Sequence, residues 1–282
     1  AFMPLCTEKY RSIWLAFKGV CVARVTLKQY RSQVHSGMES ILRSPNLRHA
    51  LDMFLTFFDK RSRKHPFPID SLVGEVTYKD RELANQLATS MNLQQFADLW
   101  GVAVKELCST NVVDCVLDEL RSHVNILSWG SEHCEGVVPT RAYAELEFRI
   151  SPSVQLTASE IEEEVRRYVQ SLEPYLTEGV LLDSIEFVAG TGEPFRAADP
   201  EGPLVKTLQR SYQSFGENIP LVPALFASIP EGATIRRALG IPFLTGGLGV
   251  GHGAHVPNEY ILEGAYERFK EWLVVFFHQV AR

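Results

Sequence analysis

The residues best suited to chemistry lie in a glycine-rich segment near the C-terminus. Residues 246–253 read Gly-Gly-Leu-Gly-Val-Gly-His-Gly, and His255, Asn258 and Glu259 follow shortly after. A zinc-ligating imidazole needs a rigid loop to fix its position and a neighbouring acceptor to fix its tautomer. This segment could supply both, so His255 is a candidate ligand. The alternative is a pair of purely structural histidines. A dinucleotide-binding loop is disfavoured, because His252 replaces the third glycine of that motif.

A second candidate is His35, in the segment Val34-His35-Ser36-Gly37. A loop histidine can donate to a substrate oxygen or act in acid–base catalysis. The adjacent Ser36 lacks the G-x-S-x-G context of an esterase nucleophile. A lone loop histidine without any role is the alternative interpretation.

The third candidate is Arg149, near the end of an apolar segment that leads into Ser151-Pro152. An arginine is badly placed for a core there, but its planar guanidinium suits bidentate recognition of a carboxylate. The alternative is an arginine that extends into solvent from the sheet edge.

Hydrophobic periodicity predicts the elements that would position these residues. Residues 20–30 alternate as a strand, residues 46–58 have helical spacing, and residues 79–121 are mostly helical. Strands are predicted at His123–Trp129 and Arg141–Ile150. The segment from Lys60 to Lys64, which precedes two prolines, is predicted to be a solvated loop, with a binding patch as the alternative.

A helix capped by Thr157 or Ser159 and a strand over Leu181–Val188 complete this region. If the helical segment 79–121 is an insertion, the order is β-α-β-β-α-β. That order is the split-βαβ plan, an antiparallel sheet with two helices on one face. Turn residues after Thr191 place a boundary near residue 190.

The remaining tail has a different pattern. It predicts a helix over residues 203–215, a short buried strand over residues 240–245 and a last helix over about 260–280. This tail is too small to close a sheet of its own, so we expect it to be the end of a domain that begins elsewhere.

Composition narrows the classes of function. The chain has 282 residues, with 28 lysines and arginines against 34 aspartates and glutamates, a net charge of −6. We therefore expect no nucleic-acid partner. No apolar stretch is long enough for a membrane helix, and no signal-peptide pattern occurs at the start. The five scattered cysteines lack a C-x-x-C pair, which favours reduced thiols and a cytoplasmic location.

Taken together, the segments resemble the aminoacylase/carboxypeptidase G/carnosinase family of dinuclear zinc exopeptidases, most closely its carnosinase-like dipeptidase branch. The likeness follows nearly the whole chain in order. Its motifs are Lys18-Gly19, His35-Ser36-Gly37, Gly136 to Pro139 with Arg141-Ala142, Arg149 with Pro152, Ala227 to Pro230, Gly240 to Pro242, Gly247 to Gly249, and His255 to Glu259.

The resemblance implies an α+β and α/β fold, with a ferredoxin-like split-βαβ lid or dimerisation domain next to a zinc-exopeptidase α/β domain. Residues 1–17 would be a linker from an absent N-terminal catalytic segment. Residues 18–190 would be the lid, with a helical insertion at about 62–121. Residues 191–282 would be the C-terminal part of the catalytic domain.

The resemblance also implies roles for individual residues. His255 would ligate zinc, and His35 would polarise the scissile carbonyl in the partner subunit of a homodimer formed through the lid. Residues 20–60 include a strand that could extend a sheet between the subunits of that homodimer. The substrate-binding residues would be Arg149, Ser228, Gly247 and Gly249. The substrate would be a dipeptide or a related N-acyl amino acid, hydrolysed at its amide bond.

Important parts of the family's pattern are missing from this sequence. The His-x-Asp segment, the bridging Asp and the Glu-Glu pair are absent, and Met38-Glu39-Ser40 replaces the double glycine that usually follows His-Ser-Gly. The family implies two zinc ions per full-length subunit, with manganese as an alternative. One histidine cannot hold two ions, so we expect the chain alone to be inactive. The competing hypotheses are a non-catalytic lid or dimerisation protein that has lost its metal site, and an unrelated split-βαβ binding module.

Overall fold

The structure is a computed structural model in which two compact units are distinguished. It describes residues 12–30, 47–58, 67–100, 102–107, 109–132, 135, 137–188, 190–224, 228–246, 251–252 and 257–281. Unit 1 comprises Ala1–Lys18, Glu75–Arg121 and Phe195–Arg282, and unit 2 comprises Gly19–Gly74 and Ser122–Pro194. We describe each unit by itself.

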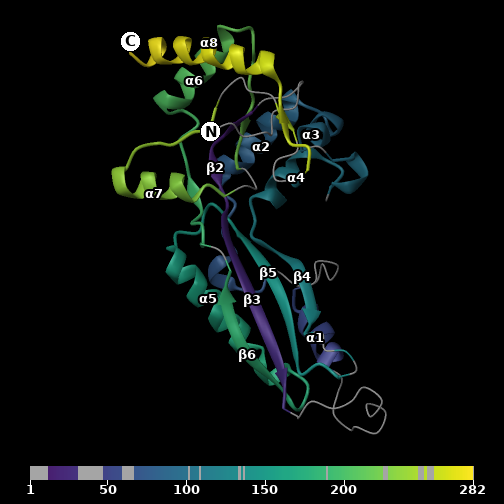
Figure 1. Cartoon of the computed structure of the whole chain (residues 1–282). Coiled ribbons are helices and arrows are strands. Elements are labelled where there is room, and N and C mark those ends of the chain that lie inside the picture. The colour runs from purple at the N-terminus through teal and green to yellow at the C-terminus, as the bar shows by residue number, and fades with distance from the viewer. Residues whose placement is uncertain are drawn as a thin grey trace. The chain divides into compact units, whose positions relative to one another are not determined.

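Unit 2 is built on one four-stranded antiparallel sheet with the order β4-β5-β3-β6. Its elements are β3 (Gly19–Gln29), α1 (Leu47–Thr56), β4 (His123–Ser131), β5 (Arg141–Ile150), α5 (Ala158–Ser171) and β6 (Val180–Phe187). Short 3₁₀ turns cover Asp70–Leu72 and Glu173–Tyr175. The long sheet and its two helices can be followed in Figure 1. This is the predicted β-α-β-β-α-β order, and the mixed α/β fold class is confirmed.

Alternation along the central strands explains why one face of this sheet is covered. In β5, Ala142, Ala144, Leu146, Phe148 and Ile150 are buried, while the residues between them are half-buried or exposed. A strand sends successive side chains to opposite faces, so the buried set lies on one face. The apolar sides of α1 and α5 pack against that face in a single core. The other face of the sheet carries mainly polar and charged residues.

Unit 1 contains short strand pairs and most of the helices. The pairs are β1 (Ile13–Trp14) with β8 (Leu221–Val222), β2 (Ala16–Phe17) with β7 (Phe195–Arg196), and β9 (Gly251–His252) with β10 (Tyr260–Ile261). The helices are α2 (Tyr78–Ser90), α3 (Leu93–Trp100), α4 (Val112–Glu119), α6 (Pro203–Gln213), α7 (Pro230–Leu239) and α8 (Glu263–Val280), with a 3₁₀ turn at Val104–Glu106.

Two buried clusters hold unit 1 together. One joins α2 and α4 to the strands through a phenylalanine group in which the Phe17 and Phe195 rings stack at a centroid distance of 5.1 Å. The other joins α6 to α8, where Trp272 stacks on Tyr212 at 5.3 Å. Trp272 also donates to Ser211 Oγ over 2.9 Å. These contacts bring together chain segments that are far apart in sequence.

Two expectations from the sequence differ from the structure. The predicted strand over residues 240–245 is irregular, because Gly240 ends α7 in the left-handed conformation and Pro242 has no N–H. The strand that was expected to extend a sheet between subunits, β3, lies between β5 and β6 and has both edges paired. The edges of the sheet are β4 and β6 instead.

The predicted domain boundaries also differ in detail from the two units. The helical insertion into the lid was predicted at about 62–121, but Glu75–Arg121 groups with unit 1. We expected a boundary near residue 190, and the two units divide after Pro194. The assignment of residues 1–17, 18–190 and 191–282 to a linker, a lid and a catalytic portion remains a prediction.

Candidate functional site

Two of the six predicted site residues fall in the part of the chain that the structure describes. These are Arg149, in β5 of unit 2, and Ser228, just before α7 of unit 1. The other four lie outside the described residues, namely His35, Gly247, Gly249 and His255. The loop from Lys60 to Lys64 lies outside them as well.

Arg149 lies on the open face of the sheet, opposite the helices. It belongs to a strand with neighbours on both sides, so it does not lie at a sheet edge. Its Nη2 donates to Glu147 Oε1 over 2.6 Å. Its side chain is 23% exposed, which leaves part of the guanidinium accessible. The position suits a carboxylate ligand, since a guanidinium has five N–H donors and can serve more than one acceptor.

Ser228 has a buried hydroxyl at the start of a helix. Its Oγ has no hydrogen-bond partner among the described residues. Ile229 follows as the N-cap of α7 without any side-chain cap, and Pro230 occupies the first turn. Buried hydroxyls are normally hydrogen-bonded, so an orphan hydroxyl at a helix N-terminus is suited to bind a polar ligand group. This observation is compatible with the substrate-binding role that we predicted for Ser228.

The residues that the structure describes do not form a metal centre by themselves. Among them, no three His, Cys, Asp or Glu side chains lie close enough together to hold an ion. The predicted ligand His255 is not one of them. We therefore assign binding and orientation roles, and no bond-making step, to the described residues.

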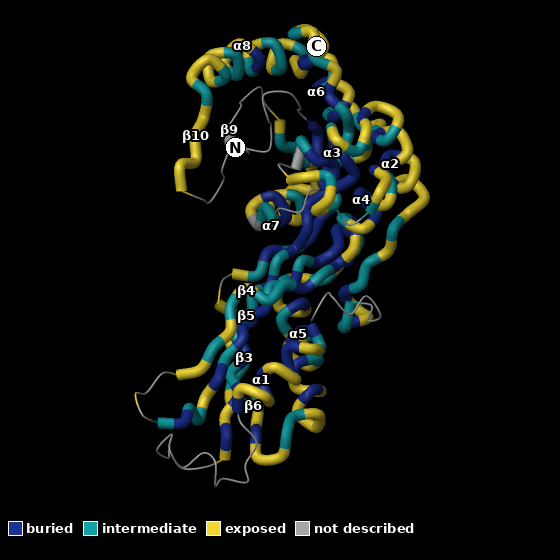
Figure 2. Tube along the Cα trace, turned by 90° about the vertical axis from the view of Figure 1, so that its right-hand side faces the viewer, coloured by how far each residue is buried: buried dark blue, intermediate teal, exposed yellow. Residues whose placement is uncertain are grey.

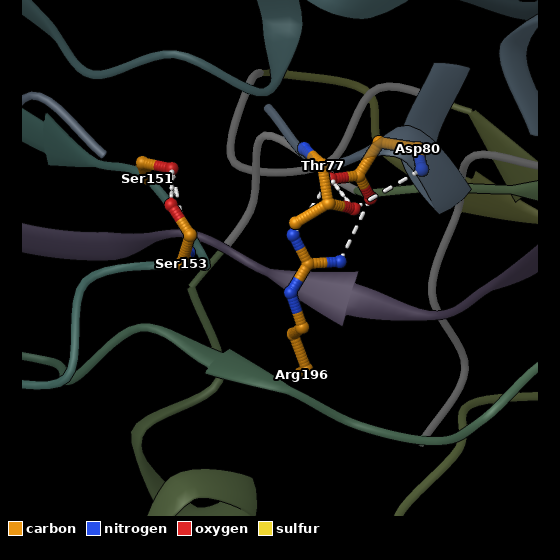
Figure 3. Close-up of polar contacts among 5 residues, drawn as sticks. All are labelled: Thr77, Asp80, Ser151, Ser153 and Arg196. Atoms are coloured by element: carbon orange, nitrogen blue, oxygen red, sulfur yellow. Dashed lines mark hydrogen bonds and ion pairs between the residues drawn. The ribbon is translucent and has the colours of Figure 1, made fainter. Parts of the chain in front are cut away.

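A polar cluster in unit 1 was missed by the sequence analysis. Asp80 is buried, and its carboxylate accepts from Arg196 Nη1 and Nη2, both over 2.8 Å. It also accepts from Thr77 N over 2.8 Å and Thr77 Oγ1 over 2.7 Å. Figure 3 shows Thr77 and Arg196 directed toward this carboxylate. Burial alone would raise the pKa of Asp80, but the hydrogen bonds from Arg196 and Thr77 outweigh it and lower that pKa.

This cluster is structural in its chemistry. Thr77 and Asp80 form the capping box that starts α2, a signature that is visible in the sequence as Thr-x-x-Asp. Arg196 attaches β7 to that helix start. No local pattern identifies Arg196, because its partner lies 116 residues away in the chain.

A separate cavity of about 460 Å³ lies in unit 1 between α2, α6 and the segment before β8. Its polar lining is mostly neutral, with the amides of Gln86, Gln209 and Asn218 beside Glu217. Glu217 pairs with Arg268 over 3.1 Å. None of the predicted site residues lines this cavity, so it is not the site that the sequence indicated.

Solved structures of peptidases share this fold. The chain is similar to the di-peptidase Dug1p from Saccharomyces cerevisiae, with a TM-score of 0.76 and 15% identity over 97% of this chain and 56% of that chain. It is similar to human carnosine dipeptidase 1, with a TM-score of 0.74 and 16% identity over 98% of this chain and 59% of that one.

A third similar structure is the M20 family metallo-carboxypeptidase Sso-CP2 from Sulfolobus solfataricus. Its TM-score is 0.68, at 20% identity over 96% of this chain and 59% of that chain. At these identities the likeness shows a shared fold. The chain thus spans little more than half the length of the peptidases that it matches.

Comparison by sequence adds no further relative, since no protein-family model and no curated protein matches. None of the helices in the described part of the chain is both long and apolar enough to cross a bilayer.

Proposed function

We propose that this chain is part of a metal-dependent hydrolase that cleaves the amide bond of dipeptides or related N-acyl amino acids. The observation that carries the proposal is the fold, which matches two dipeptidases and a carboxypeptidase over at least 96% of this chain. The order of motifs in the sequence supports the same conclusion. In this proposal zinc is the metal, two ions per full-length subunit, with manganese as the alternative.

Within this proposal the described residues recognise substrate. Arg149 binds the carboxylate of the C-terminal residue, because it is a partly accessible guanidinium on an open sheet face. The hydroxyl of Ser228, which has no hydrogen-bond partner among the described residues, binds a polar group of substrate. His35, Gly247, Gly249 and His255 keep the roles that the resemblance implies, and a cytoplasmic location remains a prediction.

The test uses the full polypeptide in which this chain occurs. Hydrolysis of Ala-Gly and of N-acetylglycine would be followed before and after dialysis against a chelator. We expect activity that is lost with the metal and restored by zinc or manganese. Activity that survives complete metal removal would contradict metal dependence, and turnover of neither substrate under any metal would contradict the hydrolase proposal.

Single substitutions separate the proposed roles. Arg149→Ala should raise KM for substrates with a free carboxylate and leave amidated substrates unaffected. The matched control is Arg24→Ala, on the neighbouring strand and the same face, where Arg24 pairs with Glu145 over 3.7 Å. We further expect His255→Ala to lower the metal content, and His35→Ala to keep the metal and lower turnover.

We also propose that the protein forms a homodimer through unit 2. The support is edge strand β4, which exposes Leu127 at 52% and Trp129 at 49%. Light scattering at micromolar concentration should give twice the chain mass. Trp129→Glu should reduce the measured mass to that of one chain. Leu181→Glu on the other edge, β6, is the control. A strictly monomeric wild-type protein would contradict this proposal.

A further inference from the structure

The partner of Arg149 is itself held from a second strand. Glu147 Oε1 accepts from Arg149, and Glu147 Oε2 accepts from Asn125 Nδ2 over 3.0 Å. Asn125 and Glu147 are direct cross-strand neighbours in the β4–β5 register. The Glu147 side chain is only 13% exposed. Its carboxylate is therefore fixed by one contact along its own strand and one contact across to the next.

The spacing explains why these three residues meet. Residues two apart on a strand project from the same face, so Glu147 and Arg149 are neighbours on the open side of β5. A residue directly opposite on the adjacent strand is also within reach. An arginine side chain has many rotamers, and ordering it when a ligand binds costs free energy. A fixed carboxylate beside it would reduce that cost in advance.

We infer that Glu147, held by Asn125, is a positioning residue that orients the guanidinium of Arg149 for a carboxylate ligand. The identity of that ligand rests on the proposed function, whereas the orientation of Arg149 does not. Glu147 acts through Arg149 and does not itself bind the substrate. Neither Glu147 nor Asn125 stands out in the sequence pattern.

The opposite role, in which Glu147 competes with the substrate carboxylate, fits the geometry less well. Glu147 is bound to Asn125 through its second oxygen, so it is held in place. Its other oxygen, Oε1, accepts from Nη2 of the Arg149 guanidinium, a group with five N–H donors. Competition also predicts the opposite result when Glu147 is removed.

The experiment compares Glu147→Ala with Glu147→Gln in the 282-residue chain. Both variants lose the same charge, but glutamine keeps an acceptor near Arg149. Nitrogen-15 NMR of the arginine side chains, with the Arg149 signal assigned through Arg149→Lys, reports whether the guanidinium is ordered. We expect ordered Arg149 in the wild type and in Glu147→Gln, and a mobile Arg149 in Glu147→Ala. Asn125→Ala should have a smaller effect in the same direction.

Binding of N-acetylglycine, with N-acetylglycine amide as the ligand lacking a carboxylate, gives the second measurement. Glu147→Gln should bind N-acetylglycine about five to ten times more tightly than Glu147→Ala, as expected for one well-oriented charged hydrogen bond. Glu145→Ala, on the same strand and face but bonded to Ser128 over 2.7 Å, is the control and should bind as the wild type does.

The outcomes separate this inference from the proposed function. Equal order of Arg149 in all variants, or equal affinity of Glu147→Gln and Glu147→Ala, would overturn the positioning role. If the wild type does not discriminate between N-acetylglycine and its amide, the carboxylate role of Arg149 in the proposed function fails. In that case the NMR comparison still decides whether Glu147 orients Arg149. Tighter binding by Glu147→Ala than by the wild type would establish competition instead.

Discussion

The two units bury apolar surface in different ways. Unit 2 places one continuous core between a four-stranded sheet and two helices, from residues that alternate along the strands. In the described part of unit 1, strands occur only as two-residue pairs, and the cores combine these strands with helices from segments far apart in sequence. An isolated strand pair is marginally stable in water, so unit 1 depends on long-range helix packing.

Exposed apolar side chains occur in both units, and in unit 1 many of them lie on helices. In unit 1, large apolar side chains remain exposed on α7, α8 and the adjoining segments, and among the eighteen residues of α8 only Trp272 is buried. The exposed ones on α8 are Tyr266, Val274, Phe277 and Val280. Figure 2 shows this helix mostly in the colours of exposed and intermediate residues. The exposed apolar residues of α8 should therefore contribute less to stability than the buried residues of the unit 2 core.

The largest expected effect tests that statement with two phenylalanines. Phe148 in unit 2 is fully buried and packs edge-on against Phe58 at 6.2 Å and Phe67 at 6.4 Å. Phe148→Ala should lower the free energy of unfolding by about 3–5 kcal/mol. Phe277→Ala in unit 1, where the ring is 63% exposed, should change it by less than about 0.5 kcal/mol. Urea denaturation measures both, and similar losses would refute the contrast.

The next effect concerns the buried carboxylate of unit 1. Asp80→Asn keeps the size of the side chain but removes the charge that Arg196 and Thr77 bind. We expect a loss of about 2–3 kcal/mol at pH 7, the range for charge-assisted hydrogen bonds to a buried group. Arg196→Lys is the matched variant, because it keeps the charge and loses the bidentate geometry. An unchanged urea midpoint in Asp80→Asn would show that this cluster does not stabilise unit 1.

The carboxylate of Asp80 also predicts the direction in which the stability of the protein changes with pH. Because the pKa of Asp80 is lower in the folded protein than in the unfolded chain, its contribution is present above the ordinary carboxyl range. It is lost as the pH falls through the lowered pKa. The stability difference between wild type and Asp80→Asn should thus be constant near neutral pH and shrink in acid. A difference that grows toward low pH would contradict the assigned shift.

The fold was predictable from the sequence where its pattern is local. The strand predicted at Arg141–Ile150 matches β5 residue for residue, since strict alternation leaves one possible face for burial. The segment 240–245 was mistaken for a buried strand. Its residues are half-buried or exposed, and the partial burial of Phe243 and Leu244 arises from packing within unit 1 without strand pairing.

The candidate site was predictable only in part, for a related reason. Arg149 could be noticed because a charge interrupts an apolar pattern, and its placement on the open face follows from alternation. Glu147 and Asn125 gave no such signal, since their importance depends on the register between β4 and β5. Arg196 was missed for the same reason, because its partner Asp80 is brought close only by the folded chain.

The smallest expected effect compares one motif in both units. Thr77 and Thr157 each start a helix with a capping box, to Asp80 in unit 1 and to Glu160 in unit 2. Removing a threonine cap costs about 1 kcal/mol. Thr157→Ala should show that value, because its box is exposed. Thr77→Ala should cost more, since it also leaves Asp80 with fewer donors while the carboxylate stays buried.

The order of these two values decides how far the units differ. A larger loss for Thr77→Ala than for Thr157→Ala, with serine at either position restoring most of the stability, would show that unit 1 concentrates its stability in a few long-range polar contacts. Equal losses would mean that the hydrogen bonds from Arg196 to Asp80 add no stability to the cap. The contrast between the units would then lie in their apolar cores alone.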